Sequence, residues 1–86
     1  MREKSVESVN KIDFTDLKVP CIAVYEHPDD YPKKCVARVY DLEKPTNTMM
    51  LKDTVDEITK DITENTGMTF VPRGPEDVLS LVGIWI

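Results

Sequence analysis

The apolar run from Val78 to Ile86, VLSLVGIWI, constrains the fold of this chain more than any other stretch. It is the longest apolar run, it is rich in β-branched residues, and the turn-forming sequence Pro72-Arg73-Gly74-Pro75 shortly precedes it. Short runs of this kind are typical of strands that are buried on both faces. We therefore expect the other elements to pack around a strand over residues 78–86.

The length of 86 residues indicates one domain. We expect a polar N-terminal segment over residues 1–17, whose order the sequence leaves open, followed by a single domain over residues 18–86. Bilayer-spanning helices need roughly 18 or more consecutive apolar residues, and the chain has no such run. The N-terminal sequence MREKSVESVN lacks the apolar core of a secretory signal, so we expect a cytoplasmic protein without a membrane partner.

The charge pattern argues against nucleic-acid binding. The formal net charge is −5, and the basic residues are scattered, with Lys33-Lys34 as the one adjacent pair. Binding to a phosphate backbone requires clustered Lys and Arg side chains that displace counterions. We therefore expect no nucleic-acid partner.

A β-hairpin is predicted in the first half of the domain. Val19–Tyr25 and Cys35–Asp41 are β-type apolar runs, and the polar segment Glu26–Lys33 between them contains two prolines. They predict a hairpin with a loop of about eight residues. Thr48–Leu51 is expected to add a short third strand, and Met68–Val71 a further extended run.

One helix is predicted from Val55 to about Asn65. Thr54 and Glu57 have the spacing of a capping box, in which each side chain accepts a hydrogen bond from the other residue's backbone N–H. Val55, Ile58 and Ile62 form a narrow apolar stripe at helical spacing. The predicted fold is therefore α+β, a mainly antiparallel sheet of three to five strands with one α-helix packed on one face.

Strand alternation predicts which hairpin side chains meet the helix. Because Arg38 is the side chain least suited to burial, it marks the outer face. The helix-facing set is predicted to be Ile22, Val24, Ala37 and Val39. On the last strand, Leu79, Leu81 and Trp85 are expected to oppose Val82, Ile84 and Ile86.

Metal and catalytic sites are not expected. Cys21, His27 and Cys35 are the soft metal ligands, but their spacing matches no common zinc pattern. Because Cys21 and Cys35 are predicted at opposite ends and on opposite faces of the hairpin, we expect neither a disulfide nor a shared metal site. A small metal-binding protein or enzyme centred on His27, with Asp29 and Asp30 beside it, remains an alternative. We predict no cofactor and no small-molecule ligand.

Aromatic side chains grouped with an arginine predict a protein-interaction surface. Tyr25, Arg38, Tyr40 and Trp85 are of the types enriched at interfaces. A core position for Trp85 is the alternative. We therefore expect a non-enzymatic binding or accessory domain that contacts a protein partner or a second copy of itself.

The order of motifs resembles a known group of proteins. The stretch YEHPDDYPKKCVARVYD, then KPTN, the capped helix, a Pro-Arg turn and a closing GIWI are similar to short bacterial proteins, often associated with phages or mobile elements, that have no assigned function. A weaker resemblance, through Asp53-Thr54-Val55-Asp56-Glu57 opening the helix, is to the small domain of HicB-type antitoxins. That resemblance implies an alternative function, inhibition of a basic partner protein through the acidic helix face, and we do not expect it to extend to DNA binding.

Overall fold

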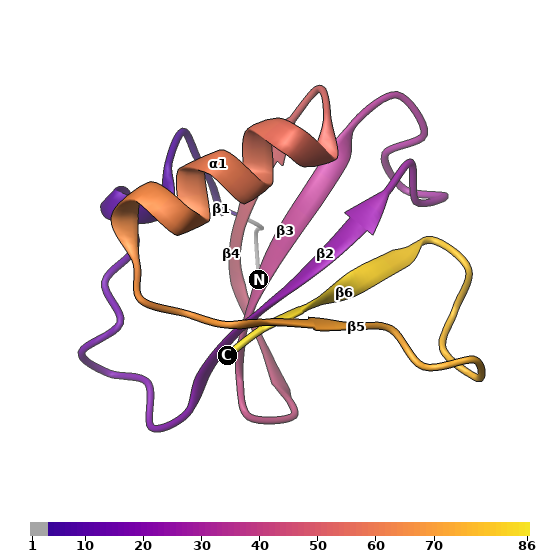
Figure 1. Cartoon of the computed structure of the whole chain (residues 1–86). Coiled ribbons are helices and arrows are strands. Elements are labelled where there is room, and N and C mark those ends of the chain that lie inside the picture. The colour runs from indigo at the N-terminus through magenta and orange to yellow at the C-terminus, as the bar shows by residue number, and fades with distance from the viewer. Residues whose placement is uncertain (1–3) are drawn as a thin grey trace.

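The structure, a computed structural model, describes residues 4–86 as one six-stranded sheet with an α-helix across one face (Figure 1). The strands are ordered β1-β4-β3-β2-β6-β5. In chain order the elements are β1 (Lys4–Val6), the 3-10 helix η1 (Val9–Lys11), β2 (Pro20–Glu26), β3 (Cys35–Asp41), β4 (Lys44–Lys52), α1 (Val55–Asn65), β5 (Phe70–Pro72) and β6 (Leu81–Trp85).

The α+β class with one α-helix is confirmed, but the predicted strand number is wrong. The described residues form six strands rather than three to five, and the sheet is mixed because β1 and β4 pair in parallel. The edge strands β1 and β5 have three residues each. The strand β5 overlaps the extended run expected over Met68–Val71. The strand β1 is held by pairing with Thr48–Met50, far away in the chain, which short local sequence patterns do not reveal.

The helix α1 begins and ends where the sequence predicts. The Thr54 side chain accepts a hydrogen bond from the Glu57 backbone N–H at 3.2 Å, and the Glu57 carboxylate accepts one from the Thr54 N–H at 3.3 Å. Ile58 and Ile62 are fully buried against the sheet. Among residues 4–86 there is no helix with the length and apolar character needed to cross a bilayer.

The hairpin of β2 and β3 presents the predicted side chains to the helix. Ile22, Val24 and Ala37 lie in the core beneath α1, and Val39 is paired with Ile22. The opposite side of the sheet, which we call the outer face, holds the row Ala23, Arg38 and Met49. It also holds the pairs two residues away in each direction, Tyr25–Val36 and Cys21–Tyr40.

The C-terminal apolar run departs from the prediction. The strand β6 is shorter than residues 78–86, and Val78 and Leu79 lie in an exposed turn, 62% and 87% exposed. The backbone N–H of Leu81 closes this turn on the Val78 carbonyl at 3.1 Å. Because β6 pairs with β2 only from Leu81 onward, Val78 and Leu79 in this turn have no strand to pack against.

A β-bulge in β6 also changes its predicted faces. Gly83 is opposite Val24 while Leu81 is opposite Tyr25, so Val82 is an extra residue in the ladder. Val82 and Trp85 consequently face the helix side, and Leu81 and Ile84 face the outer side. The predicted opposition of Leu81 with Trp85 against Val82 with Ile84 is therefore wrong.

The described part of the N-terminal segment belongs to the domain. Val9 is buried in the core, with Ile12 and Phe14 packed against it. Ser8 Oγ donates a hydrogen bond to the Asp61 carboxylate at 2.6 Å, and the Val9 backbone N–H donates to the same carboxylate at 2.7 Å. These bonds attach the segment to α1.

Candidate functional site

The outer face carries an apolar groove of about 430 Å³. It runs between the turn that connects β3 with β4 and the strand β6. Its lining consists of Cys21, Ala23, Tyr25, Tyr40, Leu42, Glu43, Leu81, Ile84 and Ile86. A hollow of this composition can receive apolar side chains of another molecule, because apolar contact area removed from water stabilises association.

Three of the four predicted interaction residues meet on this outer face. Tyr25 and Tyr40 line the groove. Arg38 forms an ion pair, at 2.6 Å, with Asp30 of the β2–β3 loop. Burial raises the pKa of Tyr25 to about 12, and a hydrogen bond with the Tyr40 hydroxyl acts in the same direction. The Tyr25 hydroxyl is therefore held in its protonated form beside Tyr40.

Trp85, the fourth predicted residue, does not belong to this surface. Its side chain is 6% exposed and lies on the helix side of the sheet, with its ring centroid 5.2 Å from that of Phe70. The alternation of β6 directs it there, opposite Ile22. Its role is in core packing.

Leu42 is the groove residue that the sequence interpretation missed. It occupies the β3–β4 turn with a φ of 59°, and its side chain is 63% exposed. The left-handed region favours glycine and is unfavourable for a bulky residue. The signal was present in the sequence, since Asp41-Leu42-Glu43-Lys44 is a two-residue hairpin turn with leucine where glycine or asparagine is usual.

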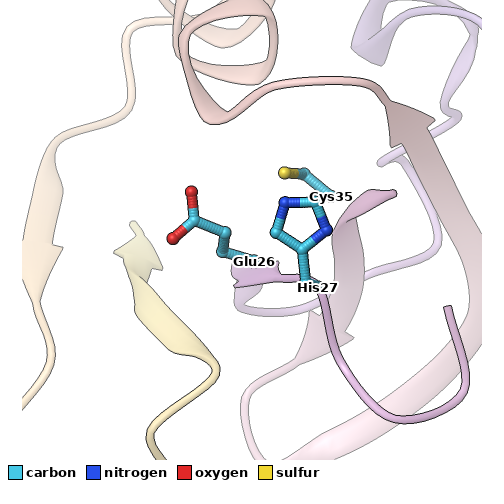
Figure 2. A group of neighbouring side chains, drawn as sticks. All are labelled: Glu26, His27 and Cys35. Carbon is cyan, nitrogen blue, oxygen red and sulfur yellow. The ribbon is translucent and has the colours of Figure 1, made fainter. Parts of the chain in front are cut away.

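A second group of side chains lies at the end of the β2–β3 ladder. The ligating atoms of Glu26, His27 and Cys35 all lie within 4.8 Å of one another. Figure 2 shows the imidazole beside the thiol, with the Glu26 carboxylate on the same side of the hairpin. Glu26 and Cys35 are direct partners in the ladder, so the hairpin itself brings these residues together.

Hydrogen bonds orient this group. Nδ1 of His27 lies 2.9 Å from the carbonyl oxygen of Pro32, and the Cys35 thiol donates to the carbonyl of Asp53 at 3.8 Å. Burial raises the pKa of the Cys35 thiol, a backbone hydrogen bond from His27 opposes that rise, and the charges of Glu26 and Asp53 add to it.

The structure separates the two cysteines as the hairpin predicts. Cys21 is opposite Tyr40 at one end of the ladder, and it lines the outer groove, whereas Cys35 is opposite Glu26 at the other end and lies in the core. Both are free thiols. In the alternative site centred on His27, Asp30 forms an ion pair with Arg38. The ligating atoms grouped with the imidazole are those of Glu26 and Cys35.

The acidic face of α1 is partly used within the molecule. Glu57 closes the capping box and Asp61 accepts the two hydrogen bonds from the N-terminal segment. These carboxylates hold the helix ends and the N-terminal segment in place, which weakens the case for this face as a docking site for a basic protein.

Comparison of the chain with family models, with curated proteins and with solved structures finds no match. The outer groove and the residues at the hairpin end are therefore the features from which a function can be inferred.

Proposed function

We propose that this protein is a non-enzymatic binding domain that associates with a second copy of itself through the outer face of its sheet. The observation that carries the proposal is Leu42, an exposed leucine in a left-handed turn beside an apolar groove. Both its backbone conformation and its exposure are unfavourable in the isolated chain. Contact with another molecule would bury this side chain and offset part of that cost.

The shape of the outer face supports a second copy as the partner. In a two-fold interface the same surface must supply both the hollow and the side chain that fills it. The outer face has the groove, and at its borders Leu42 and Ile86 project, 63% and 58% exposed. A partner copy related by a two-fold axis would insert these side chains into the groove and receive the same contacts in return.

Few charged groups would have to be desolvated at this contact. Glu43 is the charged residue among those that line the groove, and Arg38 is already paired with Asp30. Interfaces with an apolar centre and a polar border of this kind are typical of stable homodimers. The tyrosine pair adds rigid aromatic area without an unsatisfied hydroxyl, because the two phenols bond each other.

Light scattering on a sizing column tests this proposal through Leu42→Gly. We expect the unaltered protein to elute with the mass of a dimer and the variant with that of a monomer. Glycine relieves the strain at a φ of 59°, so we also expect the variant to be folded and to gain up to about 1 kcal/mol of monomer stability.

The matched control is Leu79→Ser, which removes an even more exposed leucine outside the groove. This variant should remain a dimer. A monomeric mass for the unaltered protein at its highest soluble concentration would refute self-association. A dimer that survives Leu42→Gly would place the contact on another surface.

A further inference from the structure

We propose that Glu26, His27 and Cys35 form a zinc-binding site at the end of the β2–β3 hairpin, with a fourth coordination position open to solvent. The ligands would be the Cys35 thiolate, Nε2 of His27 and one carboxylate oxygen of Glu26. This site lies apart from the outer groove, so the inference is independent of self-association.

The three ligand types suit zinc. Zinc accepts sulfur, imidazole nitrogen and carboxylate oxygen, and sites with three protein ligands keep a fourth position for water. Four-coordinate zinc, with bonds of about 2.0–2.3 Å, holds its ligand atoms roughly 3.3–3.8 Å apart. The three ligand atoms here lie within 4.8 Å of one another, so side-chain movements of about an ångström would bring them to the separation that zinc requires.

The His27 ring is already oriented for such a role. A carbonyl oxygen can only accept a hydrogen bond, so the 2.9 Å contact with Pro32 requires Nδ1 to carry the proton. In the neutral ring Nε2 then carries no proton and is available as a ligand. In Figure 2 the ring nitrogen farther from the Cβ atom points toward the Cys35 sulfur. Zinc-binding histidines are commonly held in this way by a carbonyl or carboxylate on the other nitrogen.

The backbone positions all three residues. Glu26 and Cys35 form the last pair of the β2–β3 ladder, and the His27 backbone N–H donates to the Lys34 carbonyl at 3.1 Å. His27 then turns with a φ of 48°, a conformation in which His is more common than most residues. Cys35 is fixed in the core, while Glu26 and His27 are exposed and can move toward it. Little chain order has to be gained on binding, which favours affinity.

The surrounding charge favours a cation. The carboxylates of Glu26, Asp53 and Glu57 are close enough to Cys35 to disfavour its negative charge. The same potential attracts a divalent ion, which neutralises the thiolate when it binds. Asp53 also forms an ion pair with Lys34, so part of this negative potential is balanced at the border of the site.

Titration of the protein with Co²⁺, followed by displacement with Zn²⁺, tests the site. We expect one equivalent of Co²⁺ to produce visible bands of four-coordinate cobalt and a thiolate-to-metal charge-transfer band, both removed by Zn²⁺. Loss of an orienting partner alone costs 10–100-fold in metal affinity, so loss of a ligand should cost at least about that much. We expect His27→Asn and Glu26→Gln to show such a loss.

These variants are chosen to keep the fold. Asparagine tolerates the left-handed conformation of His27, and Glu26 is exposed, so both proteins should give unchanged circular dichroism spectra. Cys35→Ser should abolish the charge-transfer band, and Cys21→Ser, which removes the cysteine of the outer groove, should leave it intact. The proposal is overturned if the unaltered protein gives no charge-transfer band, if Cys21→Ser removes it, or if the folded His27→Asn protein binds Zn²⁺ with unchanged affinity.

Discussion

The two faces of the sheet differ in how completely their side chains are buried. The helix side is filled by residues from distant parts of the chain, and Ile22, Met50, Ile58 and Ile62 are fully buried there. The outer side has no α-helix over it among residues 4–86 (Figure 1). Val36 and Met49 are buried on it, but Ile84 remains 37% exposed and a groove of about 430 Å³ stays open.

Because of this difference, we expect substitutions on the helix side to affect stability and substitutions in the outer groove to affect association. Side chains on the helix side are surrounded on all sides, so replacing them should change the free energy of unfolding. Side chains on the outer groove have free surface, so replacing them should change association more than folding. The three predictions below test this separation, beginning with the largest expected effect.

The pair Ile58→Asp and Ile84→Asp tests the separation directly. Ile58 is fully buried beneath the sheet, and an unpaired carboxylate there should cost more than about 4 kcal/mol, enough to unfold a domain of this size. Ile84→Asp places the same charge in the outer groove, and we expect a cost of about 1 kcal/mol or less together with loss of the dimer. Circular dichroism and light scattering measure the two outcomes. A folded Ile58→Asp protein would contradict the assignment of the core.

Gly83→Ala tests how closely the helix side is packed at its edge. A Cβ atom at Gly83 would collide with the Phe70 ring and lie 2.6 Å from the Val71 carbonyl oxygen. Because β5 must shift to make room, we expect a loss of about 1–3 kcal/mol in urea unfolding. The control is Gly67→Ala, where a Cβ meets nothing within 4 Å and stability should stay the same or rise slightly. Equal effects of the two substitutions would contradict the packing of Phe70 over β6.

The ionisation of Tyr25 tests the outer face at high pH. Its pKa of about 12 in the folded protein lies above the ordinary value of 10.0, so folding favours the protonated phenol. The resulting stability is fully present below about pH 10 and is lost as the pH rises from 10 to 12. We expect tyrosinate absorbance to show a group with this late ionisation, absent in Tyr25→Phe and shifted to lower pH in Tyr40→Phe. Tyr31→Phe, which removes a tyrosine outside the groove, should leave it unchanged.

Local chemistry made the helix and the hairpin predictable. The capping box of Thr54 and Glu57 and the stripe of Ile58 and Ile62 determine α1 from neighbouring residues, and both are found in place. The strands β2 and β3 are likewise recognisable from apolar runs and a proline-containing turn. Such elements depend on contacts between residues that are close in sequence.

The missed features depend on residues that are far apart. The polar segment Lys44–Asn47 has no strand pattern of its own, yet it extends β4 because Asp41 and Tyr40 of β3 pair with Lys44 and Pro45. The strand β1 exists through its parallel pairing with Thr48–Met50. Neither partner can be found from a local pattern, and the bulge at Val82 likewise arises only when β6 pairs with β2.

The residues of the two candidate sites were only partly predictable. Tyr25, Arg38 and Tyr40 follow from strand alternation, whereas the register of β6 against β2 was needed to place Ile84 on the outer face and Trp85 on the helix side. In linear zinc patterns the ligands are close in sequence, and the spacing of His27 and Cys35 matches none of these patterns. A hairpin brings its two ends together whatever the loop length, so Glu26 and Cys35 are neighbours despite their separation in the chain.

The strand order has a consequence for how the chain assembles. The three central strands and α1 are consecutive in sequence, from Pro20 to Asn65, and each joins the element before it by a short connection. The outer strands instead close long loops, since Lys4 pairs with Thr48 and Ile22 with Trp85. Loop closure costs more entropy as loops lengthen, so the middle of the chain can fold first and serve as the template on which both ends are added. During synthesis β5 and β6 leave the ribosome after β2, β3 and β4, so the outer groove, which needs β6, is completed later than the central strands.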